Sequence, residues 1–162
     1  MHNHLKSLLS ISIVVLIFFP GLLPADDRGI QRQTVGPLIN ERRVALVIGN
    51  GSYRSAPLRN PVHDARLMAE TLAKLGFEVL PREDRTQKQI KQDIKTFGGK
   101  LKQGGVGLFY YAGHGMQVGG RNYLIPVKAD IESEEDVDIE AVDAGAVLAK
   151  MAAAQNLSLI HI

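Results

Sequence analysis

The sequence predicts an α/β domain in which helices cover both faces of a mainly parallel sheet. Short apolar runs alternate along the chain with segments whose apolar residues repeat at helical spacing. Connections of this length between parallel strands are right-handed crossovers, which place the helices against the sheet. The 162 residues are 45% apolar and 22% charged, which is typical of one domain with a buried core.

The first 25 residues predict a secretory signal peptide. Lys6 precedes an apolar run over residues 8–23, and the small residue Ala25 then offers a cleavage site that would leave Asp26 first. An uncleaved membrane anchor is the alternative, but a spanning helix needs about 20 apolar residues, slightly more than this run contains. Either interpretation exports the domain, so we expect a secreted or periplasmic protein, or one anchored to the membrane at its N-terminus.

The predicted domain covers residues 42–156. Before it, residues 26–41 contain Pro, Gly, Gln and Asn without an apolar period and predict a linker. The continuous apolar run at residues 44–48 is typical of a strand buried on both faces. A helix then begins at Pro61, because Asn60 can cap it and Pro suits the first helical position.

Two more strands and a second helix continue the alternation. Gly76 ends the first helix, and residues 77–80 predict the second strand. Thr86 and Gln89 form a capping box that starts the second helix, and residues 106–112 predict a third buried strand. The apolar stripe of this second helix consists of Ile90, Ile94, Phe97 and Leu101.

The C-terminal third predicts a hairpin, a polar stretch and a helix. Residues 116–118 and 122–124 flank a Gly-Gly pair, which is a hairpin pattern. Residues 130–143 hold eight acidic residues and no basic one. They predict a solvated surface stretch, with a cation site as the alternative. The Ala-rich residues 144–154 predict a third helix.

Charge and cysteine content exclude several classes of function. The net charge of +2 argues against a dedicated nucleic-acid-binding protein, which usually carries a basic stripe. The chain contains no Cys, so these residues can form neither a disulfide scaffold nor a zinc-thiolate site, and they supply no thiol nucleophile.

Two loops follow predicted strands, where sites of open α/β sheets lie. The first, residues 49–53, begins like a dinucleotide-binding loop, but Arg54 stands where the third glycine is needed and the helix begins too late to reach a pyrophosphate. The second holds His114 between Gly113 and Gly115. We expect its ring to be exposed, and imidazole is well matched to proton transfer near neutral pH.

Five stretches of the chain, in this order, match one family: ALVIGNGSY at 45–53, LRNPVHDA at 58–65, GFEV at 76–79, GVGLFYYAGHG at 105–115 and GRNYLIPV at 120–127. From Arg43 to about Asn156 the chain thereby resembles a bacterial caspase-like or metacaspase-like cysteine peptidase domain. This resemblance implies a caspase-like three-layer sandwich.

The resemblance implies roles for three residues. His114 matches the catalytic histidine that accepts and donates the proton during acyl transfer. Gly115 matches the residue whose backbone N–H helps to form the oxyanion hole, and such donors contribute about 3 kcal/mol in other enzymes. Asp64 matches the acidic residue that holds a substrate Arg or Lys, although a carboxylate in a first helical turn is also favoured by the helix dipole alone. Arg59 lies nearby and leaves a preference for Asp open.

We expect no cofactor or resident metal. Calcium is the alternative, since metacaspase-like relatives often depend on it and the acidic stretch could supply oxygen ligands. Lys128 stands where relatives tend to carry Asp, which argues against it. The expected partners are protein or peptide substrates, with no nucleic acid and no membrane after signal cleavage.

The family's nucleophilic cysteine normally follows the third helix, on a fourth core strand that we expect to be truncated here. Residues 157–162 match the translation of a transposase adapter used in sequencing libraries, which predicts a non-native tail; the alternative is a genuine apolar strand. The sequence thus predicts a cysteine endopeptidase that cleaves after Arg or Lys, as an incomplete and inactive chain. A catalytically inactive caspase-like binding module is the alternative, and a nucleotide-binding domain is the third hypothesis.

Overall fold

The structure is a computed structural model that describes residues 10–18, 42–154 and 158–161. Its strands are β1 (Ser10–Phe18), β2 (Arg43–Gly49), β3 (Glu78–Glu83), β4 (Val106–Val118), β5 (Arg121–Leu124), β6 (Val142–Asp143) and β7 (Ser158–His161). Its helices are α1 (Pro61–Lys74), α2 (Gln87–Leu101), α3 (Glu134–Glu140) and α4 (Gly145–Ala153).

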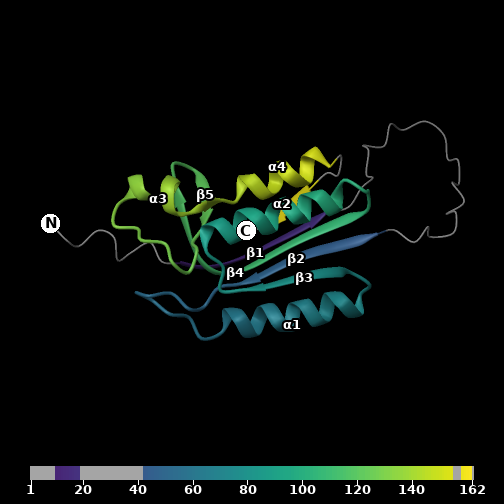
Figure 1. Cartoon of the computed structure of the whole chain (residues 1–162), viewed down its shortest axis with the longest axis horizontal. Helices are drawn as coiled ribbons and strands as arrows, with labels where there is room; N and C mark the ends of the chain where they lie inside the picture. The colour runs from purple at the N-terminus through teal and green to yellow at the C-terminus, as the bar shows by residue number, and fades with distance from the viewer. Residues whose placement is uncertain (1–9, 19–41, 155–157, 162) are drawn as a thin grey trace, which may run out of the picture.

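The described strands form one mixed sheet in the order β3-β2-β4-β1-β7, and β5 and β6 extend it from β4. Strand β2 pairs in parallel with β3 and with β4, whereas β1 is antiparallel to both β4 and β7. Helix α1 covers one face of the sheet, and α2 and α4 cover the other (Figure 1). The predicted α/β class, with helices on both faces, is confirmed.

Strand β2 separates the core into two layers because its side chains alternate between the two faces. Val44, Leu46 and Ile48 pack with the buried residues of α2 and α4. Ala45 and Val47 pack with the buried residues of α1 on the opposite face. All five are fully buried, as the continuous apolar run predicts.

Three elements differ from the sequence prediction. Strand β3 continues past residue 80 through Pro81, which an edge strand tolerates because the missing N–H costs no ladder bond there. Strand β4 continues through Gly113-His114-Gly115 to Val118, so these residues lie within a strand. The acidic stretch contains helix α3, which packs on the domain through the buried Val137.

The N-terminal and C-terminal segments also enter the sheet. Strand β1 lies in the predicted signal peptide and pairs along β4 from Leu108 to Gly115. Strand β7 lies in the predicted tail and pairs with β1. The origin of the tail and the cleavage of the leader stay predictions, because a strand conformation tests neither. Among the described residues, no helix has both the length and the apolar character to cross a membrane.

Candidate active site

Strand β4 changes partners at His114. Its parallel pairing with β2 ends at Ala112, and its antiparallel pairing with β5 begins at Gly115. His114 therefore sits at the carboxyl edge of the parallel part of the sheet, where α/β proteins place their sites. The sequence correctly locates it at this edge, but the position belongs to a continuing strand and not to a loop.

The imidazole of His114 is buried, and the prediction of an exposed ring is wrong. The residue is only 6% exposed. Its ring packs against the ring of Tyr53, with centroids 4.4 Å apart. Its Nε2 lies 2.7 Å from the carbonyl oxygen of Ala56. Tyr53 and Ala56 both belong to the β2–α1 loop, residues 50–60.

This carbonyl contact determines which ring nitrogen is free. A carbonyl oxygen only accepts hydrogen bonds, so Nε2 carries the proton of the neutral ring. The other ring nitrogen, Nδ1, is buried and has no hydrogen-bond partner among the described residues. His114 thus holds an unpaired lone pair on Nδ1 that can accept a proton.

Two tyrosine hydroxyls fix the backbone around His114. The hydroxyl of Tyr53 accepts the His114 N–H at 2.9 Å and donates to the carbonyl of Ile125 at 3.0 Å. The hydroxyl of Tyr111 lies 3.1 Å from that of Tyr53 and 2.8 Å from the Ile125 carbonyl. Burial raises the pKa of both tyrosines above 10.0, so both remain protonated donors at neutral pH.

Gly113 is required by these hydroxyls. A Cβ atom there would lie 2.6 Å from the hydroxyl of Tyr53 and 2.7 Å from that of Tyr111. The glycine before His114 therefore makes room for the tyrosine pair.

Asn50 and Asp84 hold the loop that carries Tyr53. Asn50 is fully buried and accepts the Arg85 N–H at 2.9 Å. Asp84 accepts hydrogen bonds from the backbone N–H groups of Gly51 and Ser52 at 2.8 and 2.9 Å, and from the Ser52 hydroxyl at 2.6 Å. Burial raises the pKa of Asp84, but these three hydrogen bonds outweigh it and leave the pKa below 3.8.

Asp84 also bears on the nucleotide-binding hypothesis. A phosphate in this loop would need the N–H groups of Gly51 and Ser52. Both are already donated to a carboxylate of this chain. The loop is therefore built to position Tyr53 and Ala56, and the comparison with a dinucleotide-binding loop finds no support in its geometry.

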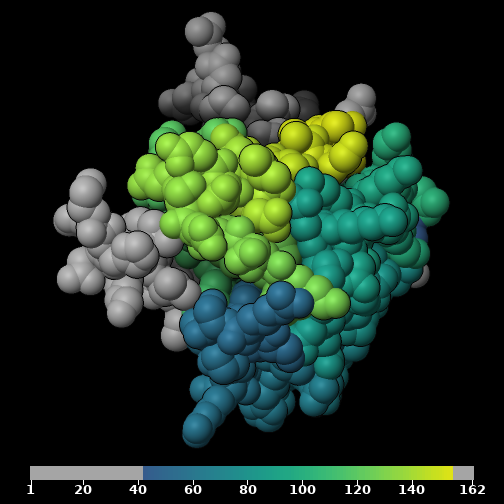
Figure 2. Space-filling view, turned by 60° about the vertical axis from the view of Figure 1, so that its left-hand side comes forward, coloured from purple at the N-terminus to yellow at the C-terminus, as the bar shows by residue number. Residues whose placement is uncertain are grey.

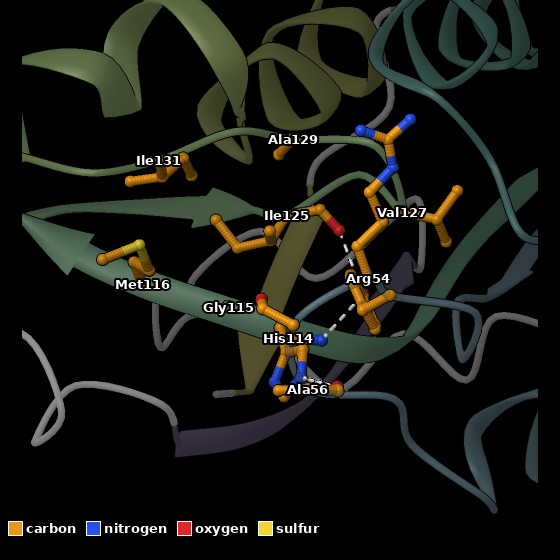
Figure 3. Close-up of a pocket in the computed structure, with 11 residues that line it drawn as sticks. Arg54, Ala56, His114, Gly115, Met116, Ile125, Val127, Ala129 and Ile131 are labelled. Atoms are coloured by element: carbon orange, nitrogen blue, oxygen red, sulfur yellow. Dashed lines mark hydrogen bonds between the residues drawn. The ribbon is translucent and has the colours of Figure 1, made fainter.

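A pocket of about 100 Å³ opens beside the imidazole (Figure 3). His114, Gly115 and Met116 of β4 form one wall, and Tyr53 to Ala56 of the β2–α1 loop form another. The third wall comes from the segment after β5, from Ile125 to Ile131. In Figure 2 the blue β2–α1 region lies directly against this lime-green segment.

Asp64 lies outside this pocket. It occupies the first turn of α1, where it is half-buried and its N–H is donated to the carbonyl of Asn60 at 2.9 Å. Burial and the Asp64 charge together raise the pKa of Tyr110. The structure places His114 and Gly115 next to each other on β4. It places Asp64 on α1, the helix that covers the sheet face carrying Tyr110 and Ala112. Arg59 is exposed in the loop before α1.

Two carboxylates of the acidic stretch bind groups of the domain itself. Asp136 accepts hydrogen bonds from the N–H and hydroxyl groups of Ser133, which caps α3. Asp138 pairs with Arg121 and accepts a hydrogen bond from the hydroxyl of Tyr123, at the short distance typical of a charged acceptor. Within residues 42–154 and the other described segments, no group of three or more His, Cys, Asp or Glu side chains is arranged to hold a metal ion.

Comparison with known proteins agrees with this architecture. The family model described as a caspase domain matches residues 42–160. The chain belongs to the caspase-domain family. Human mucosa-associated lymphoid tissue lymphoma translocation protein 1 is 35% identical over 100 residues, and its mouse homologue is 37% identical over 100 residues. Each match covers 61% of this chain and 12% of the relative, so the chain spans about an eighth of the relatives' length.

Membership of the caspase-domain family indicates a cysteine-peptidase type of function. The printed chain contains His114 at the position that the resemblance assigns to the catalytic histidine, and it contains no cysteine. Tyr53, Tyr111 and the Ala56 carbonyl, which support His114, are not predicted from the sequence. The only signal for them was a pair of aromatic residues beside the two strand ends, which is not distinguishable from core aromatics in a single sequence.

Proposed function

We propose that this domain supplies the histidine half of a cysteine endopeptidase that cleaves after Arg or Lys. The observation that carries the proposal is the buried imidazole of His114, whose Nε2 proton is held by the Ala56 carbonyl while Nδ1 stays unpaired. This arrangement suits a general base that must take a proton and return it.

The proposed reaction passes one proton through Nδ1. His114 takes the proton of a cysteine thiol, and the thiolate attacks the scissile carbonyl to form a tetrahedral oxyanion, which the N–H of Gly115 stabilises. The C–N bond then breaks, the amine leaves with the proton from Nδ1, and an acyl-thioester remains. Water activated by Nδ1 hydrolyses it. The thiol must come from outside the 162 printed residues, so the printed chain alone is inactive in this proposal.

Asp64 is proposed to select the residue before the cut bond. A carboxylate binds a guanidinium or ammonium group through charge-assisted hydrogen bonds. The side chain is half-buried at the start of α1 and has no ion-pair partner among the described residues. It is therefore available for a substrate cation.

The test joins residues 42–154 to the cysteine-bearing continuation of the gene and measures cleavage of fluorogenic peptides. We expect cleavage after Arg or Lys, loss of cleavage in His114→Ala, and full activity in the matched control His63→Ala, whose side chain is exposed on α1. Asp64→Ala should lose the preference for basic residues while it keeps some turnover. Cleavage chiefly after Asp, or His114-dependent cleavage by the printed 162-residue chain, would refute the proposal.

Three further expectations belong to this proposal. The enzyme is exported through its N-terminal leader, which cleavage after Ala25 would remove. It acts on protein or peptide substrates. It needs no cofactor, and added calcium or a chelator should leave its rate unchanged.

A further inference from the structure

The pocket beside His114 is lined largely by apolar side chains. Its third wall and one end are aliphatic and are formed by Met116, Ile125, Val127, Ala129 and Ile131. Ile125 and Val127 are buried in a small core cluster, and the other three residues pack against that cluster while they remain partly exposed to the pocket. The surface is therefore rigid and apolar, which is typical of a ligand site.

One charged side chain borders this apolar wall. Arg54 is exposed, lines the pocket and has no ion-pair partner among the described residues. Figure 3 shows it extending from the β2–α1 loop toward the segment that carries Ile125 to Ile131. No acidic residue lines the pocket. The charge of the site is therefore positive and unbalanced.

The size of the pocket limits its occupant. Its volume of about 100 Å³ is below the roughly 150 Å³ of an apolar cavity that holds benzene. An aliphatic side chain fits this volume better than an aromatic one. A basic residue would meet Arg54, which disfavours it.

We infer that this pocket is a second specificity subsite, which takes an aliphatic side chain of the substrate peptide and binds a neighbouring acidic residue through Arg54. The inference rests on the proposed peptidase function. It adds a preference that Asp64 cannot supply, because Asp64 selects a cation and lies outside this pocket.

The test measures binding by the full printed chain, labelled with ¹³C at the methyl groups of Met and Ile. The probe is the peptide acetyl-Gly-Leu-Glu-Gly-amide. We expect saturable shifts at Met116 and Ile131, and none at Ile139, which is 69% exposed on α3 and does not line the pocket. Replacing Leu by Asn in the probe should weaken binding about tenfold. Replacing Glu by Lys should weaken it about two- to fivefold at low salt.

Two variants assign these preferences to the pocket. Ala129→Leu fills the pocket without opening a cavity and should remove the preference for Leu. The matched control Ala152→Leu adds the same side chain at an exposed position of α4 and should keep it. Arg54→Gln should remove only the preference for Glu.

Equal affinity for the Leu and Asn peptides, or shifts at Ile139 of the same size as at Met116, would overturn the subsite. This readout needs no nucleophile, so it is independent of cleavage. If the peptides bind as expected and the cysteine-bearing protein does not cleave, the proposed peptidase function is wrong and the binding site stands.

Discussion

Tyr53 links the β2–α1 loop to strand β4 through one hydroxyl group. We expect Tyr53→Phe to destabilise the fold by about 1–3 kcal/mol, because the buried His114 N–H loses its acceptor. The measurement is equilibrium unfolding in urea. Tyr110→Phe is the matched control, because Tyr110 is also buried and its hydroxyl makes no hydrogen bond among the described residues. Equal losses in the two variants would show that the hydroxyl of Tyr53 is not a support.

Asp84 makes the stability of the fold depend on pH through its contacts with the β2–α1 loop. Its folded pKa lies below 3.8, so the stability that it contributes is complete above about pH 4 and is lost as the pH falls through the folded pKa. Asp84→Asn keeps a residue that tolerates the positive φ of 49° at this position. We expect the variant to be about 1.5 kcal/mol less stable at pH 7, with a difference that shrinks below pH 4. A difference that stays constant down to pH 2 would contradict the assignment.

For single residues, the sequence predicts the location of a side chain in the fold better than its burial and contacts. His114 and Gly115 are predicted at the correct edge of the sheet because a glycine-flanked histidine after a buried strand is a local pattern. The burial of His114 is not predictable in this way, because Tyr53 and Ala56 are 61 and 58 positions away in the sequence. Only the folded β2–α1 loop brings them onto the ring.

At the scale of elements, a buried carboxylate joins β3 to α2. Asp93 accepts from Arg82 Nε at 2.7 Å and lies 3.4 Å from Arg85 Nε, and its side chain is 12% exposed. We expect Asp93→Asn to cost about 1–3 kcal/mol in a thermal or urea unfolding measurement, because two partly buried arginines lose a charged partner. The matched control is Glu83→Gln. Glu83 pairs with Arg66 at the same distance, but its side chain is 42% exposed and water screens the pair, so we expect a much smaller effect. Equal effects would show that burial does not govern the contribution.

Elements with a strong local pattern are predicted well. The helix starts at Pro61 and after Thr86 are confirmed, as is the hairpin around Gly119-Gly120. Helix α3 is missed because charge dominates residues 130–143 and a single buried residue, Val137, anchors the helix. The extension of β4 is missed because two glycines suggest the end of a strand, whereas here one of them admits the tyrosine hydroxyls.

At the scale of the whole molecule, the strands on the two sides of β2 are protected in different ways. Strand β3 lies at one edge and carries Pro81 and charged residues, which protect an edge from pairing with other chains. Strand β4 has no such protection, and β1 covers it from Leu108 to Gly115. Removal of the predicted leader would remove β1 as well.

We therefore expect residues 42–162 alone, without the cysteine-bearing continuation, to aggregate, because β4 then exposes unpaired backbone groups beside apolar side chains. A chain that begins at residue 10 keeps β1 and is the matched control. Sedimentation velocity and light scattering at several concentrations measure the difference. A shortened chain that stays monomeric at high concentration would show that β4 needs no covering strand.

The hydrogen bond from the His114 N–H to Tyr53 makes this amide a reporter of motion in the β2–α1 loop. Most amides of a central strand exchange with solvent deuterium only when strands separate. This amide is protected by a side chain, so it exchanges whenever the loop lifts Tyr53 away, even while the sheet stays intact. The Ile125 N–H provides the internal reference. It is donated to the backbone carbonyl of His114 at 3.0 Å, so a backbone group of the same residue protects it. Faster exchange at His114 than at Ile125 would measure, under native conditions, how often the imidazole loses its support.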